Sequence, residues 1–231
     1  MLICAVVFPF LAPAARLDQV GRFSRRMLRA LGLTLEVAGA APQAGPVMLA
    51  ANHVSWLDIL AINAVSTARF VSKSDVRHWP VLGWMVACGG TLFIERERKR
   101  DAMRVVHQVA EALQSGDVIA LFPEGTTSDG HRLLPFHANL LQAAVATGAP
   151  VQGVALRYAD DSEAVSQAAA YIGDTTLLAS LWAVVAARGL RAQVVMLPAE
   201  WPGDRDRRAL SDGIREQIAQ ALDLTAAPTA P

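Results

Sequence analysis

Short apolar runs rich in β-branched residues alternate with helix-like patterns along most of this 231-residue chain. Between the runs, apolar residues recur every three or four positions, as in residues 103–113 and 210–222. Strands separated by helices favour a largely parallel sheet covered by helices. We therefore predict a single-domain α/β sandwich with a largely parallel mixed sheet. The strands are expected at residues 34–38, 47–51, 69–72, 91–95, 118–122, 151–158 and 192–197.

The composition limits the classes of protein that this chain can belong to. It is 53% hydrophobic and 18% charged, which argues against a disordered, collagen-like or basic nucleic-acid-binding protein. No run reaches the roughly 18 uncharged apolar residues of a membrane span, which excludes a polytopic membrane protein. Residues 1–104 carry a net charge of +6 and the rest −6. A face that meets an anionic partner would explain this asymmetry, and chance segregation of solvated charges is the alternative.

The N-terminus combines an apolar run with a cluster of arginines. Residues 1–15 are uncharged, and the next fourteen hold five arginines against Asp18 alone. As a helix the apolar run would be about 22 Å long, short of a roughly 30 Å hydrocarbon core. We expect shallow or re-entrant insertion, followed by an amphipathic helix at residues 23–33 that ends at Gly32. A cleavable signal peptide and a core helix are the alternatives.

These patterns divide the chain into three predicted parts. Residues 1–32 form a membrane-associating helical segment, residues 33–224 form the folded domain, and residues 225–231 form a disordered tail.

The first of three polar loops lies between the strand at 47–51 and a helical pattern. His53 comes just before the expected helix, and Asp58 lies one turn into it. A carboxylate that holds one ring nitrogen fixes the tautomer of the imidazole and leaves the other nitrogen as a base. This arrangement can activate a hydroxyl. An N-capping histidine and a surface aspartate are the structural alternative.

The other two loops carry groups that could bind an anion. Residues 122–130 follow an apolar strand, and their glycines and hydroxyls let backbone N–H groups approach a ligand. Glu124 in this loop could order the site or accept a hydrogen bond from a substrate hydroxyl, although such a loop is often an ordinary turn. Arg96 directly follows the strand at 91–95, where its guanidinium could hold a phosphate.

Together these loops resemble the glycerolipid acyltransferase family, typified by the 1-acylglycerol-3-phosphate acyltransferases. His53 and Asp58 match its N-H-x-x-x-x-D block. Residues 93–96 match its F-I-x-R block, residues 122–128 its F-P-E-G-T-x-S block, and residues 149–151 its later proline-valine block. The order and spacing agree over about residues 33–200, which implies an acyltransferase domain at 33–224 with a motif core at 47–158.

The resemblance implies transfer of a fatty acyl group from acyl-CoA or acyl carrier protein to the free hydroxyl of a lysolipid. The expected reaction converts 1-acylglycerol-3-phosphate to phosphatidate in phospholipid biosynthesis. His53 would be the general base and Asp58 would orient it. No metal or cofactor is implied, because a base and backbone donors near the thioester oxygen can supply the chemistry. The implied acceptor-binding residues are Arg96, Glu124, Gly125, Thr126 and, by a weaker match, Lys73.

One departure from the family pattern leaves the acceptor open. Thr127 stands where many members that use lysophosphatidate have arginine, so another lysolipid, such as lyso-ornithine lipid, is an alternative acceptor. Two alternative functions are that of a non-catalytic lipid-binding protein on the same scaffold and that of a metal-dependent hydrolase. A metal site is poorly supported, because His131 and His137 have only Asp129 as a nearby acidic residue.

The expected partners follow from the implied reaction. They are membrane lipids, a lysolipid acceptor and acyl-CoA or acyl carrier protein, without nucleic acid. We expect a monotopic or peripheral protein on the cytoplasmic face of a bacterial-type inner membrane.

Overall fold

A computed structural model describes residues 11–73, 90–94 and 99–224 of the chain. Arg96, the first ten residues of the predicted membrane-associating segment and the predicted tail lie outside these ranges. The strands of the described part are β1 (Thr34–Gly39), β2 (Val47–Ala51), β3 (Arg69–Lys73), β4 (Leu92–Ile94), β5 (Val118–Leu121), β6 (Val151–Ala159) and β7 (Arg191–Glu200).

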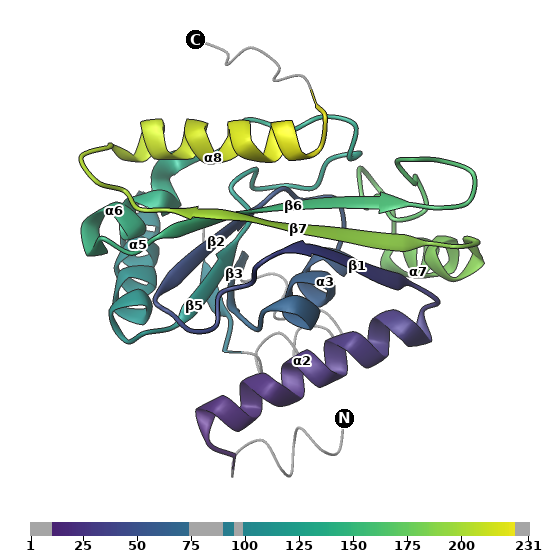
Figure 1. The fold of residues 1–231 in the computed structure, drawn as a ribbon, viewed down its shortest axis with the longest axis horizontal. Helices are drawn as coiled ribbons and strands as arrows, with labels where there is room; N and C mark the ends of the chain where they lie inside the picture. The colour runs from purple at the N-terminus through teal and green to yellow at the C-terminus, as the bar shows by residue number, and fades with distance from the viewer. Residues whose placement is uncertain (1–10, 74–89, 95–98, 225–231) are drawn as a thin grey trace.

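These strands form one seven-stranded sheet in the order β1-β7-β6-β2-β5-β3-β4 within the described residues. Neighbouring strands are parallel except for β6 and β7, so β1 and β7 run against the other five. Figure 1 shows β7 and β6 crossing the middle of the molecule, with β1 below them. The predicted α/β sandwich with a largely parallel mixed sheet is confirmed.

Helices cover both faces of the sheet, so residues along the central strands are buried on both faces. In β2, Leu49 packs into one apolar cluster and Met48 into the other. The first cluster lies under α2 (Pro13–Ala30), α3 (Leu57–Val65) and α7 (Leu177–Ala186). The second lies under α5 (Lys99–Gln114), the 3₁₀ helix η3 (Ala138–Leu141), α6 (Gln142–Thr147) and α8 (Arg207–Ala221).

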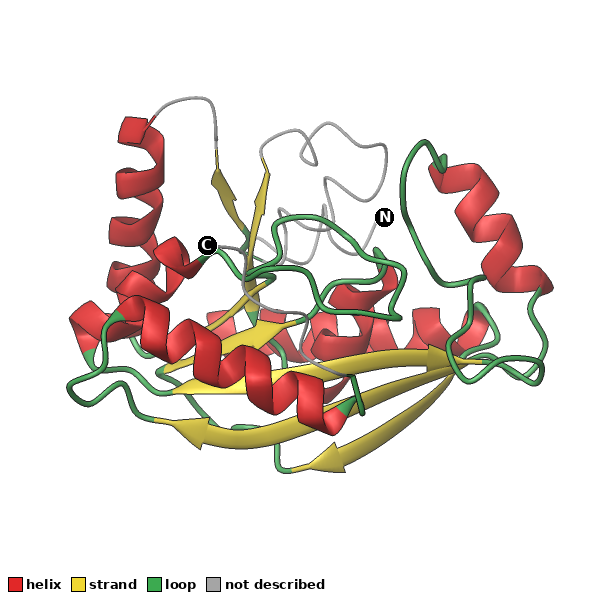
Figure 2. Cartoon of the chain, turned by 90° about the horizontal axis from the view of Figure 1, so that it is seen from above, coloured by secondary structure: helices red, strands yellow, loops and turns green. Residues whose placement is uncertain are grey.

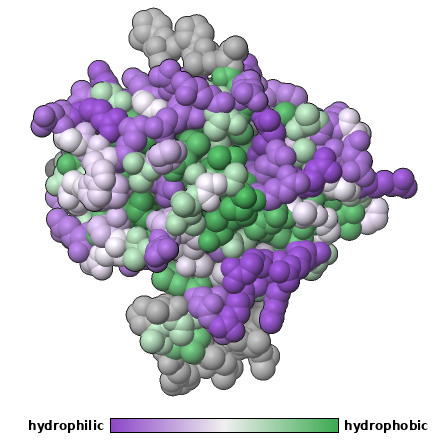
Figure 3. Space-filling model, in the orientation of Figure 1, coloured by the Kyte–Doolittle hydropathy of each residue, from purple (hydrophilic) through white to green (hydrophobic). Residues whose placement is uncertain are grey.

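The arginine-rich helix α2 begins ten residues before the predicted start. A proline at its first turn is compatible with a helix start, because that position needs no N–H donor. The helix ends as predicted near Gly32, whose φ is 81°, and the N–H of Leu33 bonds the carbonyl of Leu28 at 2.9 Å. Leu28 is buried in the first cluster, whereas the polar outer side of α2 forms a hydrophilic band on the surface (Figure 3).

No helix in the described part of the chain is long and apolar enough to cross a membrane.

Helices α3 and α7 have no clear helical periodicity in the sequence. In α3, seven of the nine residues are buried, Asp58 and Asn63 among them, so the helix has no polar side that faces solvent. In α7 the sequence LLASLWAVVA has no charged residue that would mark a solvent face. Periodicity can delimit a helix only when one side is polar. The sequence therefore predicted a helix after His53 without setting the bounds of α3, and it did not predict α7.

Candidate active site

The candidate catalytic residues lie at the carboxyl end of β2, a central strand of the sheet. All five residues of β2 are buried, which fixes the position of the chain as it leaves the sheet at Asn52. The chain then turns through His53 and enters α3, whose first turn contains Asp58. Ligand-binding residues of open α/β sheets gather at this end of the strands. Figure 2 shows α5 and α7 on opposite sides of the loops at this end.

The structure brings His53 and Asp58 into direct contact. His53 Nδ1 lies 2.7 Å from Asp58 Oδ2, and the side chains are 19% and 0% exposed. The same oxygen accepts the N–H groups of Val54 at 2.7 Å and Ser55 at 2.9 Å. An ionised carboxylate can only accept, so a neutral imidazole carries its proton on Nδ1 in this bond. The Nε2 nitrogen of His53 therefore has a free lone pair and can act as a base.

The imidazole ring of His53 is also fixed by an aromatic stack. Its centroid lies 3.9 Å from that of Phe122, and the two rings are nearly parallel at 9°. Phe122 in turn contacts Phe70 of β3 at a centroid distance of 5.8 Å. The contacts with Asp58 and Phe122 hold the ring in one orientation, which a positioned base requires.

The loop of residues 122–130 is joined to the backbone of His53 through Glu124 and Ser128. Glu124 is buried, and its two carboxylate oxygens accept the N–H groups of His53 at 2.9 Å and Leu134 at 3.0 Å. The N–H of Ser128 donates to the carbonyl of His53 at 2.7 Å. In the structure Glu124 thus holds two loops together, and its predicted contact with an acceptor remains a prediction.

Burial raises the pKa of Glu124 to about 7, against the opposing effect of the two N–H donors. The folded protein therefore holds a proton that the unfolded chain releases near pH 4.5, so its free energy of unfolding falls as pH rises from about 4.5 to about 7. Glutamine at position 124 cannot titrate, so wild type should lose about 2 kcal/mol of its free energy of unfolding relative to Glu124→Gln between pH 5 and pH 7.5. Urea unfolding of both proteins at these two pH values measures the change, and a constant difference would show that Glu124 does not titrate in this range.

Of the remaining predicted binding residues, Gly125 and Thr126 lie in the loop of residues 122–130, and Lys73 lies at the end of another strand. Gly125 has a φ of 73° and its N–H bonds the carbonyl of Phe122 at 3.1 Å, which closes a turn, and the next residue, Thr126, is exposed. Lys73 is the last residue of β3, which β5 separates from β2. Arg96 lies outside the described residues.

Thr127, which departs from the family pattern, has a partner within the protein. Its hydroxyl donates to the carbonyl of Tyr171, and the N–H of Tyr171 donates to the carbonyl of Val54 at 3.0 Å. This short chain of hydrogen bonds ties the segment before α7 to both functional loops.

Asn52 and Tyr158 make contacts at the site that the sequence did not predict. The side-chain amide of Asn52 bonds the N–H and carbonyl of Leu156 at 2.7 and 2.9 Å, which continues the pairing of β2 with β6. The hydroxyl of Tyr158, also on β6, donates to Asp58 Oδ1 at 2.7 Å. Asn52 adjoins His53 in the motif, whereas Tyr158 lies 100 positions from its partner and has no sequence signal.

Within the described residues, no three histidine, cysteine, aspartate or glutamate side chains are grouped as metal ligands would be. The exposed ring of His131 contacts Gln167 rather than His137.

Comparisons with known proteins agree with the motifs at this site. A family model described as Acyltransferase matches residues 34–157. The chain is 41% identical to the 1-acyl-sn-glycerol-3-phosphate acyltransferase of Neisseria meningitidis serogroup B, over 89% of this chain and 81% of the relative. It is 39% identical to the lyso-ornithine lipid O-acyltransferase of Pseudomonas aeruginosa, over 88% of this chain and 78% of the relative.

The fold is also similar to a solved structure. The crystal structure of the 1-acyl-sn-glycerophosphate acyltransferase of Thermotoga maritima superposes with a TM-score of 0.68, over 90% of this chain and 78% of that one. The two sequences are 20% identical, so this likeness concerns the fold.

Proposed function

This chain belongs to the acyltransferase family, and on that premise we propose that it transfers a fatty acyl group from a thioester to the free hydroxyl of a lysolipid. The observation that carries the proposal is the buried contact between His53 and Asp58, 2.7 Å long, at the carboxyl end of β2. Such a pair supplies the base that an acceptor hydroxyl needs, and general base catalysis contributes about 10²–10⁴-fold in rate.

The reaction follows from the position of the base. Nε2 of His53 takes the proton of the acceptor hydroxyl while the hydroxyl oxygen attacks the thioester carbonyl. The new C–O bond forms, the C–S bond breaks, and the proton passes from the imidazolium to the leaving thiolate. Asp58 holds the ring and stabilises the imidazolium, as the acidic residue does in other His-carboxylate pairs. The donor is acyl-CoA or acyl carrier protein, and no further cofactor is needed.

The proposed acceptor is 1-acylglycerol-3-phosphate, which yields phosphatidate. The Neisseria relative supports this assignment by its name and by 41% identity. Arg96, Lys73, Gly125 and Thr126, together with Glu124, are the proposed contacts of the head group. Lyso-ornithine lipid is the second candidate, which is favoured by the Pseudomonas relative and by Thr127, whose hydroxyl has a partner within the fold.

The proposed location is the cytoplasmic face of a bacterial-type inner membrane, where both lipid substrate and product reside. The arginines of α2 support association with anionic headgroups, each contributing about 1 kcal/mol near such a surface.

An acceptor panel tests the proposal. Purified protein is mixed with acyl-CoA or acyl carrier protein and, in turn, 1-acylglycerol-3-phosphate, lyso-ornithine lipid and other lysolipids, and the products are identified by mass. We expect one acceptor to gain one acyl group with a kcat/KM at least about ten-fold above the others. Binding of lysolipid without any acylated product would instead support a non-catalytic lipid-binding protein.

A further inference from the structure

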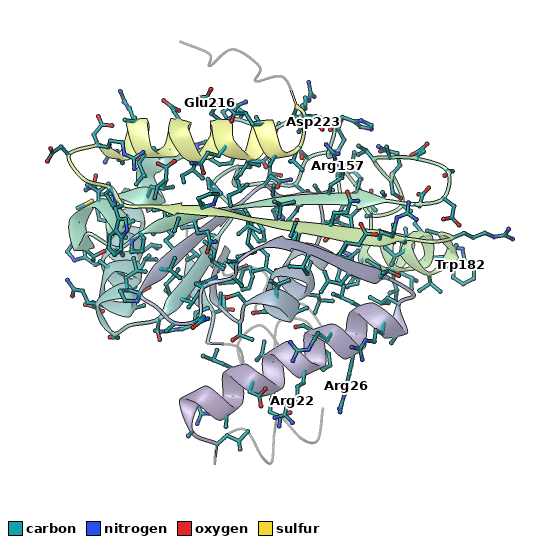
Figure 4. All side chains as sticks on the ribbon, viewed as in Figure 1. Arg22, Arg26, Arg157, Trp182, Glu216 and Asp223 are labelled. Carbon is teal, nitrogen blue, oxygen red and sulfur yellow. The ribbon has the colours of Figure 1, made fainter. Side chains whose placement is uncertain are left out.

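Helix α7 exposes an apolar face that the described fold leaves uncovered. The outward side chains are Leu178 at 77% exposure, Leu181 at 37%, Trp182 at 76% and Val185 at 56%. Their spacing places them on one side of the helix, and Figure 4 shows Trp182 at the outer edge of the molecule. An apolar patch on a soluble protein commonly marks an interaction surface, and this helix has no charge to keep it in water.

The opposite side of α7 packs against the loop that carries His53. Ser180 is buried and accepts the indole N–H of Trp56 at 3.0 Å, and Val184 lies in the first apolar cluster. Trp56 stands between His53 and Asp58 in the chain. The exposed face of α7 is therefore one helix diameter, about 10 Å, from the loop that carries the proposed base.

We propose that this face of α7 docks onto a lipid bilayer, a proposal that rests on the proposed function because the acceptor is a membrane lipid. Ten helical residues are about 15 Å long, so α7 would lie in the interface and not cross it. Trp182 suits this position, because indole rings concentrate at the boundary between headgroups and acyl chains.

Charge in the same layer of helices points to a lipid surface as the occupant of this face. Helix α2 covers the same face of the sheet as α7, and its arginines Arg22, Arg26 and Arg29 are exposed. Figure 3 shows the hydrophilic band of α2, and Figure 4 shows Arg22 and Arg26 directed away from the sheet. An apolar helix with cationic groups in the same layer complements anionic headgroups over an acyl core.

Co-sedimentation with vesicles of phosphatidylethanolamine and phosphatidylglycerol tests this docking surface. The double variant L178E/W182E places two charges on the face, and the matched variant M103E/W201E places two at positions that are 63% and 68% exposed elsewhere. We expect the first to lower the vesicle partition coefficient at least about ten-fold and the second less than about two-fold. All four side chains are exposed, so both variants should melt like wild type.

The remaining outcomes distinguish docking on lipid from a dimer interface at this face. With acceptor in detergent micelles, L178E/W182E should keep wild-type turnover, whereas with acceptor in vesicles its turnover should fall. Unchanged vesicle binding would overturn the proposal, and a shift from dimer to monomer with binding unchanged would assign the face to a second copy. Absence of turnover by wild type in micelles would refute the proposed function alone, because vesicle binding needs no chemistry.

A second inference rests on the buried tyrosine of β6. Tyr158 is 1% exposed and donates to Asp58 Oδ1 at 2.7 Å, whereas Oδ2 receives His53 and two backbone N–H groups. The tyrosine thus occupies the oxygen that His53 does not use. We infer that Tyr158 is a positioning residue that fixes the rotation of the Asp58 carboxylate and, through it, the ring of His53. Burial raises the pKa of Tyr158 well above its ordinary value, so the hydroxyl remains a donor.

Tyr158→Phe removes only this hydroxyl and tests its role. We expect kcat to fall about ten-fold while KM for donor and acceptor changes less than about two-fold, because the substrates do not touch the tyrosine. The matched variant Val194→Ala removes buried apolar volume from the same cluster and should lower the melting temperature with little change in kcat. An unchanged kcat in Tyr158→Phe, or an equal loss in both variants, would overturn the inference.

Discussion

Replacing His53 with alanine is expected to reduce acyl transfer by about 10²–10⁴-fold, the contribution of a positioned general base. The imidazole makes the 2.7 Å contact with Asp58 and the stack on Phe122, whereas the backbone of His53 keeps its own bonds to Glu124 and Ser128. Because these backbone bonds do not involve the ring, the loops should stay in place. Turnover at saturating donor and acceptor measures the effect, and thermal unfolding reports whether the domain remains folded.

His107→Ala is the matched control, because His107 is an exposed residue of α5 in the other helix layer. Its turnover should equal that of wild type. Near-normal turnover in His53→Ala would remove the base from the mechanism, whereas equal losses in both variants would point to a general effect on the protein.

The second large effect is expected for Asp58→Asn. Removing the charge leaves the imidazolium without its counter-ion at the moment it forms, so turnover should fall by about 10²–10⁴-fold. The amide oxygen can still accept the N–H groups of Val54 and Ser55, but the amide nitrogen would then face Tyr158, whose hydroxyl loses its acceptor. An unpaired buried group costs about 1–3 kcal/mol, so urea unfolding should detect a loss of stability of that size.

Asp212→Asn, a change at an exposed position of α8, serves as the control and should alter neither quantity. Retention of more than half of wild-type turnover by Asp58→Asn would contradict the proposed role of the carboxylate. A loss of turnover with unchanged stability would instead question the hydrogen bonds assigned to it.

The parts of the fold that were predicted from sequence are those with a local signal. Buried β-branched runs located the central strands, and an amphipathic pattern located α5 and α8. The direction of β7 had no such signal, because its pairing with β6 follows a 31-residue connection that includes α7. Helix α3 was expected after His53 but was not delimited, because it is buried on nearly every side.

The candidate site shows the same division between local and long-range information. His53 and Asp58 are five positions apart across the start of one helix, so the sequence could place them together. The bonds of Glu124 to His53 span 71 positions, and those of Tyr158 to Asp58 span 100. Their partners are set by the order of β2, β5 and β6 in the sheet, which a single sequence does not encode in any local pattern.

Acyl transfer to a lysolipid is measured most directly by the release of free thiol from acyl-CoA or acyl carrier protein, followed together with the mass of the lipid product. We expect each thiol released by the wild-type protein to be matched by one newly acylated lysolipid. We also expect release to be negligible without acceptor and to fall with His53→Ala. Thiol release that is independent of the lysolipid, or lysolipid bound with no thioester consumed, would contradict the proposed function.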